Sequence, residues 1–189
     1  GISWSSKNNV RIRSLSHIIQ VSSKSSPSGN RSLSTDSVLV GATLNDIYYS
    51  LDNGHSWSFV KTVEGINDIA YADGIFLIVG GGTGFIERSV DGINWETKIS
   101  EGSFITSVAF GPEIIVATGH NDRLLVSHDS GETWQDGNLG DGSQARFASI
   151  IYAPNKFVAV GNAINGLSSR WATSVDGINW ENITVDPNY

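Results

Sequence analysis

The sequence predicts an all-β protein of the β-propeller class, with about four complete four-stranded blades plus one extra strand. A motif of Ser, Asp, Gly and Trp occurs four times, at intervals of about 40 residues. No ten-residue stretch has the 3.6-residue apolar period of an amphipathic helix. A period near 40 residues with short strands is what a four-stranded propeller blade requires.

The repeated motif is Ser, one spacer, Asp, then Gly, then Trp, at residues 50–57, 89–95, 127–134 and 174–180. Its last three tryptophans follow the preceding one by 38, 39 and 46 residues. We expect each copy on the hairpin between the third and fourth strands. There the Asp accepts turn N–H groups, the Gly supplies a positive φ, and the Trp enters strand four as a largely buried side chain at the seam between blades. These structural roles fall to Asp52, Trp57, Asp91, Trp95, Asp129, Trp134, Asp176 and Trp180.

Short apolar runs precede the motifs at 76–79, 114–117 and 157–160, with a shorter run at 38–40. Continuous apolar runs of this length are typical of strands that are buried on both faces. Half-apolar runs come before them, separated by turns such as Asp73-Gly74. For the second blade we expect strands at about 66–72, 75–80, 85–90 and 94–99, and the other blades follow the same scheme.

We expect residues 1–189 to form a single β-propeller domain or a propeller fragment. A Ser-rich stretch at about 22–36 is typical of an exposed, flexible insertion. Residues 4–12 resemble strand four of a preceding blade. Either the chain is a fragment of a larger propeller, or this strand supplements a four-bladed ring. We favour the fragment, because the sequence opens in the middle of a motif.

The four motifs, together with the run 156–161 ahead of 173–180, resemble the Asp-box (BNR) repeat of the sialidase-like propeller superfamily. They look closest to its non-catalytic bacterial and phage surface members. The resemblance implies that a ligand binds on the face formed by the loops from strand two to three and from strand four to one. It also implies an extracellular, cell-surface or virion location.

Composition excludes several classes of function. The net charge of -7 is spread along the chain without a basic run, so we expect no nucleic-acid partner. No apolar run is long enough for a membrane span, so we expect no membrane insertion. With no Cys and four His at unpaired spacings, we expect no metal site and no cofactor.

Sialidase chemistry, which the resemblance implies, requires three arginines, a Tyr–Glu pair and an acid/base Asp at one mouth of the channel. The start of the chain offers only Val10-Arg-Ile-Arg13, and the other arginines share no position between repeats. No residue therefore receives a catalytic role, and we expect the protein not to be an enzyme.

On the expected ligand face, polar loop residues accompany one aromatic side chain, a composition that suits sugar hydroxyls or a protein partner. The alternative for the aromatic residue, Trp171, is that it begins strand three and belongs to the core. We interpret the chain as a non-catalytic module that binds glycan or protein. One alternative is a structural or decoration component of a larger assembly, such as a phage virion, and another is a sialidase-type glycoside hydrolase. The candidate ligand residues are His120, Asp122, Arg146, Asn162, Asn165, Arg170 and Trp171.

Overall fold

The computed structural model describes residues 17–21, 38–140, 145–163 and 168–183. Within them the chain forms sixteen β-strands and no helix. These strands form four antiparallel sheets of four strands each, and the strands of every sheet follow one another in sequence order. The all-β fold with four-stranded blades is therefore confirmed. The expected insertion at about 22–36 and the expected strand at 4–12 lie outside the described residues.

We number the sheets as blades 1 to 4. Blade 1 holds β1 (His17–Val21), β2 (Val38–Ala42), β3 (Asp46–Ser50) and β4 (Ser58–Thr62). Blade 2 holds β5 (Ile66–Ala72), β6 (Ile75–Gly80), β7 (Phe85–Ser89) and β8 (Glu96–Ile99). Blade 3 holds β9 (Ile105–Phe110), β10 (Ile115–Gly119), β11 (Leu124–Ser127) and β12 (Gln135–Asp136). Blade 4 holds β13 (Ala145–Ala153), β14 (Lys156–Ala163), β15 (Ser169–Ser174) and β16 (Glu181–Ile183).

The strands of blade 2 lie where the sequence predicts them, except at the start of the fourth strand. That strand begins at Glu96 and not at residue 94, because the backbone N–H of Asn94 donates to the Asp91 carboxylate and remains part of the turn. Trp95 therefore stands just ahead of β8, and the other three motif tryptophans stand just ahead of or at the edge of their fourth strands in the same way. The prediction that Trp enters strand four is wrong by one residue.

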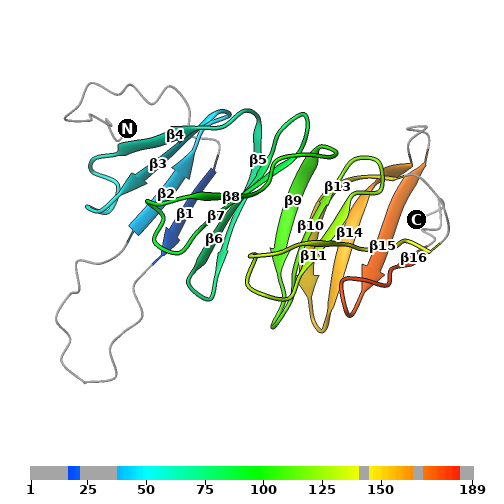
Figure 1. Cartoon of the computed structure of the whole chain (residues 1–189). Coiled ribbons are helices and arrows are strands. Elements are labelled where there is room, and N and C mark those ends of the chain that lie inside the picture. Colours follow the sequence, from blue (N-terminus) through cyan, green and yellow to red (C-terminus); the bar gives the residue numbers. More distant parts are fainter. Residues whose placement is uncertain (1–16, 22–37, 141–144, 164–167, 184–189) are drawn as a thin grey trace, which may run out of the picture.

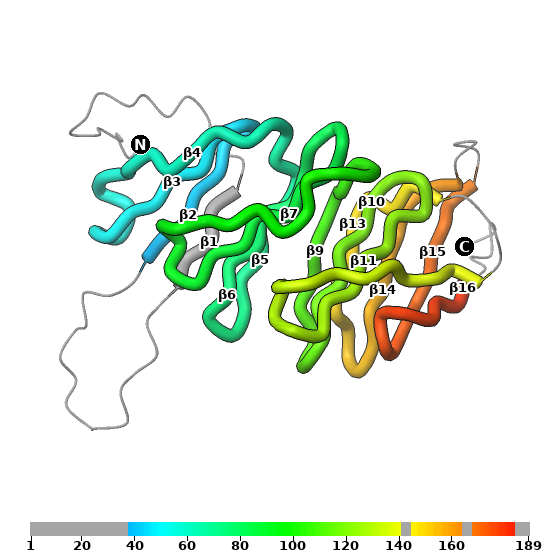
Figure 2. Tube along the Cα trace, in the orientation of Figure 1, coloured from blue at the N-terminus to red at the C-terminus, as the bar shows by residue number. Residues whose placement is uncertain are grey.

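The first strands of successive blades, β1, β5, β9 and β13, lie side by side, so they form the inner edge of the array. The fourth strands form the outer edge and are largely exposed. Figures 1 and 2 show the four blades following one another across the molecule, with blades 1 and 4 at opposite ends. In the described part of the chain this is an open arc of four blades.

Each seam between blades is closed by the glycine of a motif turn, which packs on the second strand of the blade before it. A Cβ added to Gly92 would meet Val40 at 2.7 Å, and one added to Gly131 would meet Leu77 at 3.2 Å. A Cβ on Gly177 would likewise meet Val116 at 2.8 Å. All three glycines have positive φ, so glycine is required both by backbone conformation and by the close approach of the neighbouring blade.

The tryptophans of the last three motifs lie in these seams, whereas Trp57 lies on the side of blade 1 that points away from blade 2. Trp57 and Trp180 are buried, whereas Trp95 and Trp134 are half-buried. The indole N–H groups of Trp95, Trp134 and Trp180 donate to the carbonyl of the glycine three residues earlier, at 3.1, 3.1 and 2.7 Å. The Trp57 indole N–H has no hydrogen-bond partner among the described residues.

Candidate functional site

A β-bulge stands near the start of the inner strand in blades 2, 3 and 4. The register shifts between Ile66 and Asp68 in β5, and between Phe147 and Ser149 in β13. The third shift lies where Gly119 pairs with Ile105 while Thr118 pairs with Ser107. The extra residues are therefore Asn67, Thr106 and Ala148, which occupy equivalent positions at the inner edge of the arc.

A glycine ends or nearly ends the second strand opposite each bulge, at Gly80, Gly119 and Gly161. A Cβ at any of these positions would collide with a backbone carbonyl at the start of the inner strand of its own blade. The sequence pattern of an apolar run that leads into glycine thus has a physical cause, which is the close contact between two backbones at the bulge.

Side chains at the bulges connect each inner strand to the next blade. The Asn67 amide donates to the carbonyl of Ile105 at 2.6 Å, and the Thr106 hydroxyl donates to the equivalent carbonyl, of Phe147, at 2.7 Å. One residue further on, the Asp68 carboxylate accepts from the backbone N–H of Val108 at 3.0 Å. These bonds fix the positions of the inner strands relative to one another, and so hold the side chains at their starts in place.

An open hollow of about 380 Å³ lies over the bulges, with side chains from β5, β9, β13 and β14 around it. Three of the residues predicted to bind a ligand line it, namely His120, Arg146 and Asn162. Arg146 and Asn162 are paired neighbours on β13 and β14, and both are exposed. The lining contains one cationic side chain and no carboxylate. The other lining residues are Asn67, Thr106, Phe147 and Ala148.

His120 is held at the rim by its backbone and by its ring. Its N–H donates to the Phe104 carbonyl at 2.9 Å, and its imidazole stacks on the Phe104 ring with centroids 4.8 Å apart. Within the described residues, the side chains of Arg146 and Asn162 have no hydrogen-bond or ion-pair partner. Within the described part of the chain, the polar side-chain groups of His120, Arg146 and Asn162 thus have no protein partner and can form hydrogen bonds to a ligand.

The other predicted ligand residues do not join this group. Asp122 hydrogen-bonds the backbone N–H of Ala145, which ties the loop after β10 to blade 4, and it does not line the hollow. Arg170 and Trp171 lie within β15, because β14 and β15 extend further than the sequence predicts and leave only a short connection. Asn165 is in that connection, outside the described residues.

Trp171 is 39 % exposed and pairs with Val160 and Ile183 on the face of blade 4 that points away from blade 3. The expected placement of Trp171 in a loop of the ligand face is therefore wrong, because it lies in β15. Its position in strand three matches the alternative, but its exposure shows that it is not enclosed in the core.

Asn67 and Thr106 line the hollow although the sequence analysis did not single them out. A signal for them is present in the sequence. At or near the start of the inner strands of blades 2, 3 and 4 stand an apolar residue, a variable residue and then Asp or Ser: 66–68, 105–107 and 147–149. The variable residue is the one that the bulge turns toward the inner edge of the arc.

The motif aspartates hold the turns between the third and fourth strands. The Asp52 carboxylate accepts from the hydroxyl and the backbone N–H of Ser56, and these bonds hold the pKa of Asp52 at about 2. Asp129 has the same arrangement with Thr133 and a pKa of about 2. Each carboxylate therefore serves as an acceptor within its own turn.

The shorter turns place their aspartates in the same role. For Asp176, burial is the largest influence and raises the pKa, but the hydrogen bonds from Asn179, Ile178 and Ser174 outweigh it and lower the pKa to about 2. The Asp91 carboxylate is held in the same way, with a pKa also lowered to about 2. The hydroxyl of the motif Ser completes each turn by accepting from the buried glycine N–H at 2.8 Å.

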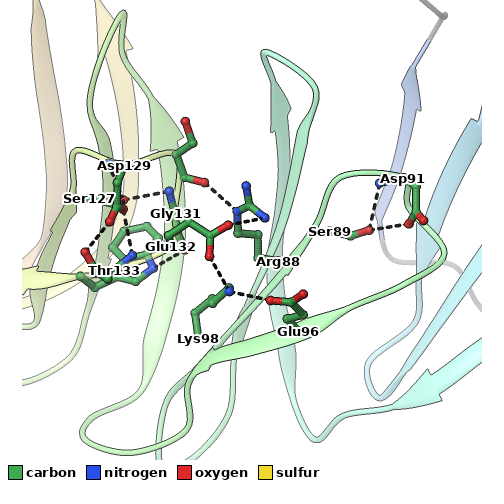
Figure 3. Close-up of polar contacts among 12 residues, drawn as sticks. Arg88, Ser89, Asp91, Glu96, Lys98, Ser127, Asp129, Gly131, Glu132 and Thr133 are labelled. Atoms are coloured by element: carbon green, nitrogen blue, oxygen red, sulfur yellow. Dashed lines mark hydrogen bonds and ion pairs between the residues drawn. The ribbon is translucent and has the colours of Figure 1, made fainter.

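Charged side chains bridge the seam between blades 2 and 3, as Figure 3 shows. Arg88 of β7 contacts the Glu132 carboxylate at 2.9 Å and donates to the Ser130 carbonyl at 2.8 Å. Lys98 lies 2.6 Å from both Glu132 and Glu96. These pairs satisfy one another across the seam, and they leave no unpaired arginine there to bind a ligand.

The described residues contain no group of three or more His, Cys, Asp or Glu side chains placed to hold a metal ion. Nor do they contain a helix with the length and apolar character needed to cross a membrane.

No family model and no curated protein matches the sequence. Solved structures of β-propellers are, however, similar to the structure of this chain. An ancestral GH74 enzyme superposes with a TM-score of 0.63 at 18% identity, over 80% of this chain and 23% of that one. The computationally designed Ika4 protein gives 0.54 at 18% identity, over 71% and 83%. YCF48 bound to D1 peptide gives 0.51 at 19% identity, over 79% and 49%.

This chain thus spans less than a quarter of the GH74 enzyme and about half of YCF48. At identities below 20% the likeness concerns the fold alone, and it shows that the protein is a β-propeller.

Proposed function

We propose that this chain is a non-catalytic β-propeller recognition module, which binds a polar partner, glycan or protein, in the hollow over the inner strands. The observation that carries the proposal is the convergence of Arg146, Asn162 and His120 around one hollow, with their polar groups unused in the described residues. Binding sites commonly combine a concave surface with a few well-placed polar groups on rigid elements.

The surroundings of the three side chains support the same proposal. The side chains of Asn67 and Thr106 donate hydrogen bonds to backbone carbonyls of the next blade, so they hold the inner strands beneath the hollow in place. Around the hollow remain a guanidinium, an amide and an imidazole, which favour a ligand rich in hydrogen-bond acceptors such as carbonyl, hydroxyl or carboxylate oxygens. Among the similar solved structures, YCF48 is bound to D1 peptide.

We further propose that the four motif turns are Asp-box turns of the sialidase-like type and that their role here is structural. Their carboxylates are directed to N–H and hydroxyl groups of their own turns, in both the longer and the shorter form. A carboxylate saturated in this way is poorly placed to act as a nucleophile or a proton donor.

A binding experiment tests the recognition site. Wild type, Arg146→Ala and Asn162→Ala would be compared on a glycan array and a peptide array, with Lys156→Ala as the control. Lys156 is exposed at the opposite end of the strand that carries Asn162. We expect Arg146→Ala to lose about tenfold or more in affinity, since a hydrogen bond to a charged group is worth about 1.5–3 kcal/mol. A smaller loss is expected for Asn162→Ala, because a neutral hydrogen bond is worth about 0.5–1.5 kcal/mol.

Unchanged binding by both site variants, with folding verified by thermal melts, would remove the hollow from consideration. Turnover of an aryl glycoside by the wild type would overturn the non-catalytic part of the proposal.

A second candidate function, a component of a larger assembly, is favoured by one observation. Blade 4 exposes Ile151, Trp171 and Ile183 on the face that points away from blade 3. Exposed apolar patches on otherwise soluble proteins commonly mark interaction surfaces.

A further inference from the structure

A pocket of about 70 Å³ opens at the seam between blades 2 and 3, at the opposite end of the inner strands from the hollow. Its apolar walls include Ile75 of β6, Phe110 of β9 and Ile115 of β10. The β5–β6 and β9–β10 turns that border it lie next to each other at the lower edge of Figure 1. We call this end of the arc the motif-turn face, and its described turns are 51–57, 73–74, 90–95, 111–114, 128–134, 154–155 and 175–180.

The size of one side chain explains why the pocket lies in this seam. In blade 4, Tyr152 pairs with Phe157 next to the hairpin turn, and their rings meet edge-on with centroids 5.0 Å apart. They lie so close to blade 3 that a Cβ added to Gly111 would meet Phe157 at 2.7 Å. Blade 2 also has two aromatic residues at this place, but in blade 3 the pair is Phe110 and Ile115. Ile115 is shorter than a phenylalanine, and the space that it leaves is the pocket.

The mouth of the pocket is anionic. Asp73 of the β5–β6 turn and Glu113 of the β9–β10 turn stand there, with the exposed His128 and Ser130 of the third motif. In the described part of the chain neither carboxylate has a hydrogen-bond or ion-pair partner, and the pocket lining contains no lysine or arginine. Arg88, which donates to the Ser130 carbonyl, is itself held in an ion pair across the seam. The two negative charges are therefore left uncompensated.

An anionic mouth over apolar walls fits an alkyl chain that ends in a cation. A pocket of about 70 Å³ holds about five non-hydrogen groups, since each needs roughly 10–15 Å³. The side chain of lysine consists of four methylene groups and an ammonium. Its stem packs along apolar surface while the charged end stays among polar groups, and the ammonium has three N–H donors for the carboxylates and the imidazole at the mouth.

The surroundings of the pocket indicate that the lysine belongs to a protein. His128 occupies the spacer position between the Ser and the Asp of its motif. At the same position the other blades expose Leu51, Val90 and Val175, to 56, 61 and 75 %. Apolar side chains that recur on one face in successive blades indicate a contact surface for a partner.

The charge of the motif-turn face favours a basic partner. Its described turns contain no lysine or arginine. An excess of one charge on a face attracts partners of the opposite charge and orients them. The acidic residues of these turns are Asp52, Asp73, Asp91, Glu113, Asp129, Glu132 and Asp176.

We propose that the pocket between blades 2 and 3 is a second binding site, which takes the lysine side chain of a basic protein segment lying along the motif-turn face. Its walls come from the ends of β5 and β9, whereas the hollow lies at their starts. The two sites therefore share no residue, and each can be tested without the other.

Two matched peptides test the site by NMR. The first is acetyl-Ala-Lys-Ala amide, and the second has norleucine in place of lysine, which keeps the four-carbon stem and removes the charge. We expect the lysine peptide to shift the backbone amide signals of Ile75, Glu113 and Ser130 until they saturate. The norleucine peptide is expected to bind at least about tenfold more weakly, because the contacts of the ammonium with the carboxylates are lost.

Variants of the pocket separate its charge from its shape. Asp73→Asn combined with Glu113→Gln is expected to weaken binding of the lysine peptide about tenfold, and asparagine tolerates the positive φ at position 73. Ile115→Phe restores the aromatic pair of the neighbouring blades and is expected to abolish binding. Glu101→Gln, at an exposed position in the β8–β9 connection, is the matched control and is expected to bind as wild type does. Ile75→Phe narrows the same pocket and replaces Ile115→Phe if the latter lacks the circular dichroism spectrum of wild type.

Four outcomes would overturn the inference. The first is a lysine peptide that causes no shift up to its solubility limit. The second is equal binding of the norleucine peptide, which would indicate an apolar pocket without charge recognition. The third is unchanged binding by the double carboxylate variant, and the fourth is unchanged binding by the folded variant with the filled pocket.

Discussion

Blades 2 and 4 have the same strand order, motif turn and bulge, yet they differ in how their second and third strands are covered. Leu77, Val79 and Ile86 of blade 2 are completely buried. Their counterparts in blade 4 include Trp171, the bulkiest apolar side chain of the set, which is exposed to 39 %. The difference shows that burial in this fold is decided by the adjacent blade and not by the apolar character of the residue alone.

The largest effect that would test this comparison comes from two tryptophans of blade 4. Trp180 lies in the seam with blade 3, is 5 % exposed and donates to the Gly177 carbonyl. We expect Trp180→Ala to lower the free energy of unfolding by about 3–5 kcal/mol, as for other large buried side chains. Trp171→Ala in the same blade is expected to cost about 1 kcal/mol or less, because its surface is only partly removed from water.

Urea unfolding in the wild-type background checks the pair. Equal losses for the two substitutions would contradict the view that only the covered face is energetically important.

Two glycines separate backbone strain from the contact between blades. Gly177 and Gly74 both have positive φ, but only Gly177 has a neighbouring blade within reach of a Cβ. Gly74→Ala is expected to cost about 1–2 kcal/mol for the left-handed conformation alone. Gly177→Ala adds overpacking against Val116, so we expect a total of about 2–4 kcal/mol in thermal or urea unfolding. The seam model fails at this point if the two variants are equally stable.

Acid titration tests how much the hydrogen bonds of a motif turn contribute to stability. The pKa of Asp176 is lowered to about 2 in the folded protein, whereas an unfolded Asp titrates near 3.9. A depressed folded pKa contributes stability that is present above the unfolded value and is lost as pH falls from about 4 toward 2. We expect Asp176→Asn to be slightly less stable than wild type at pH 7 and to lose less stability over that range, as measured by urea unfolding at each pH. An unchanged acid slope would show that this carboxylate does not hold its turn.

Much of the fold could be predicted because each blade of a propeller repeats the same local sequence patterns. The Asp-Gly turn at 73–74, the apolar run at 76–79 and the motif at 89–95 each specify local backbone structure, so strand limits in blade 2 followed within one or two residues. Trp171 was harder to place. The sequence analysis grouped it with the polar loop residues of the ligand face, but β14 continues through Ala163, and pairing with β15 depends on contacts that a local pattern does not contain.

The candidate site could be predicted only in part, for a related reason. His120, Arg146 and Asn162 stand in loops or strand ends that a blade scheme assigns to one face, so the sequence could place them together, and in the structure they line one hollow. Asn67 and Thr106 were missed because a bulge breaks the alternation from which the orientation of a strand residue is usually inferred. Their partners are carbonyl groups of the next blade, about 40 residues away in the sequence.

The hydrogen bonds that join the inner strands also affect which blade unfolds first. Asn67 reaches blade 3 and Thr106 reaches blade 4, but the third bulge residue, Ala148, has no side-chain donor to offer. A repeat array behaves as a series of nearest neighbours, so a unit supported on one side has the lowest cost of local unfolding. In a single chain, the amide hydrogens of β15 and β16 should therefore exchange with solvent before those of β6 and β10, and loss of order should spread from blade 4 inward.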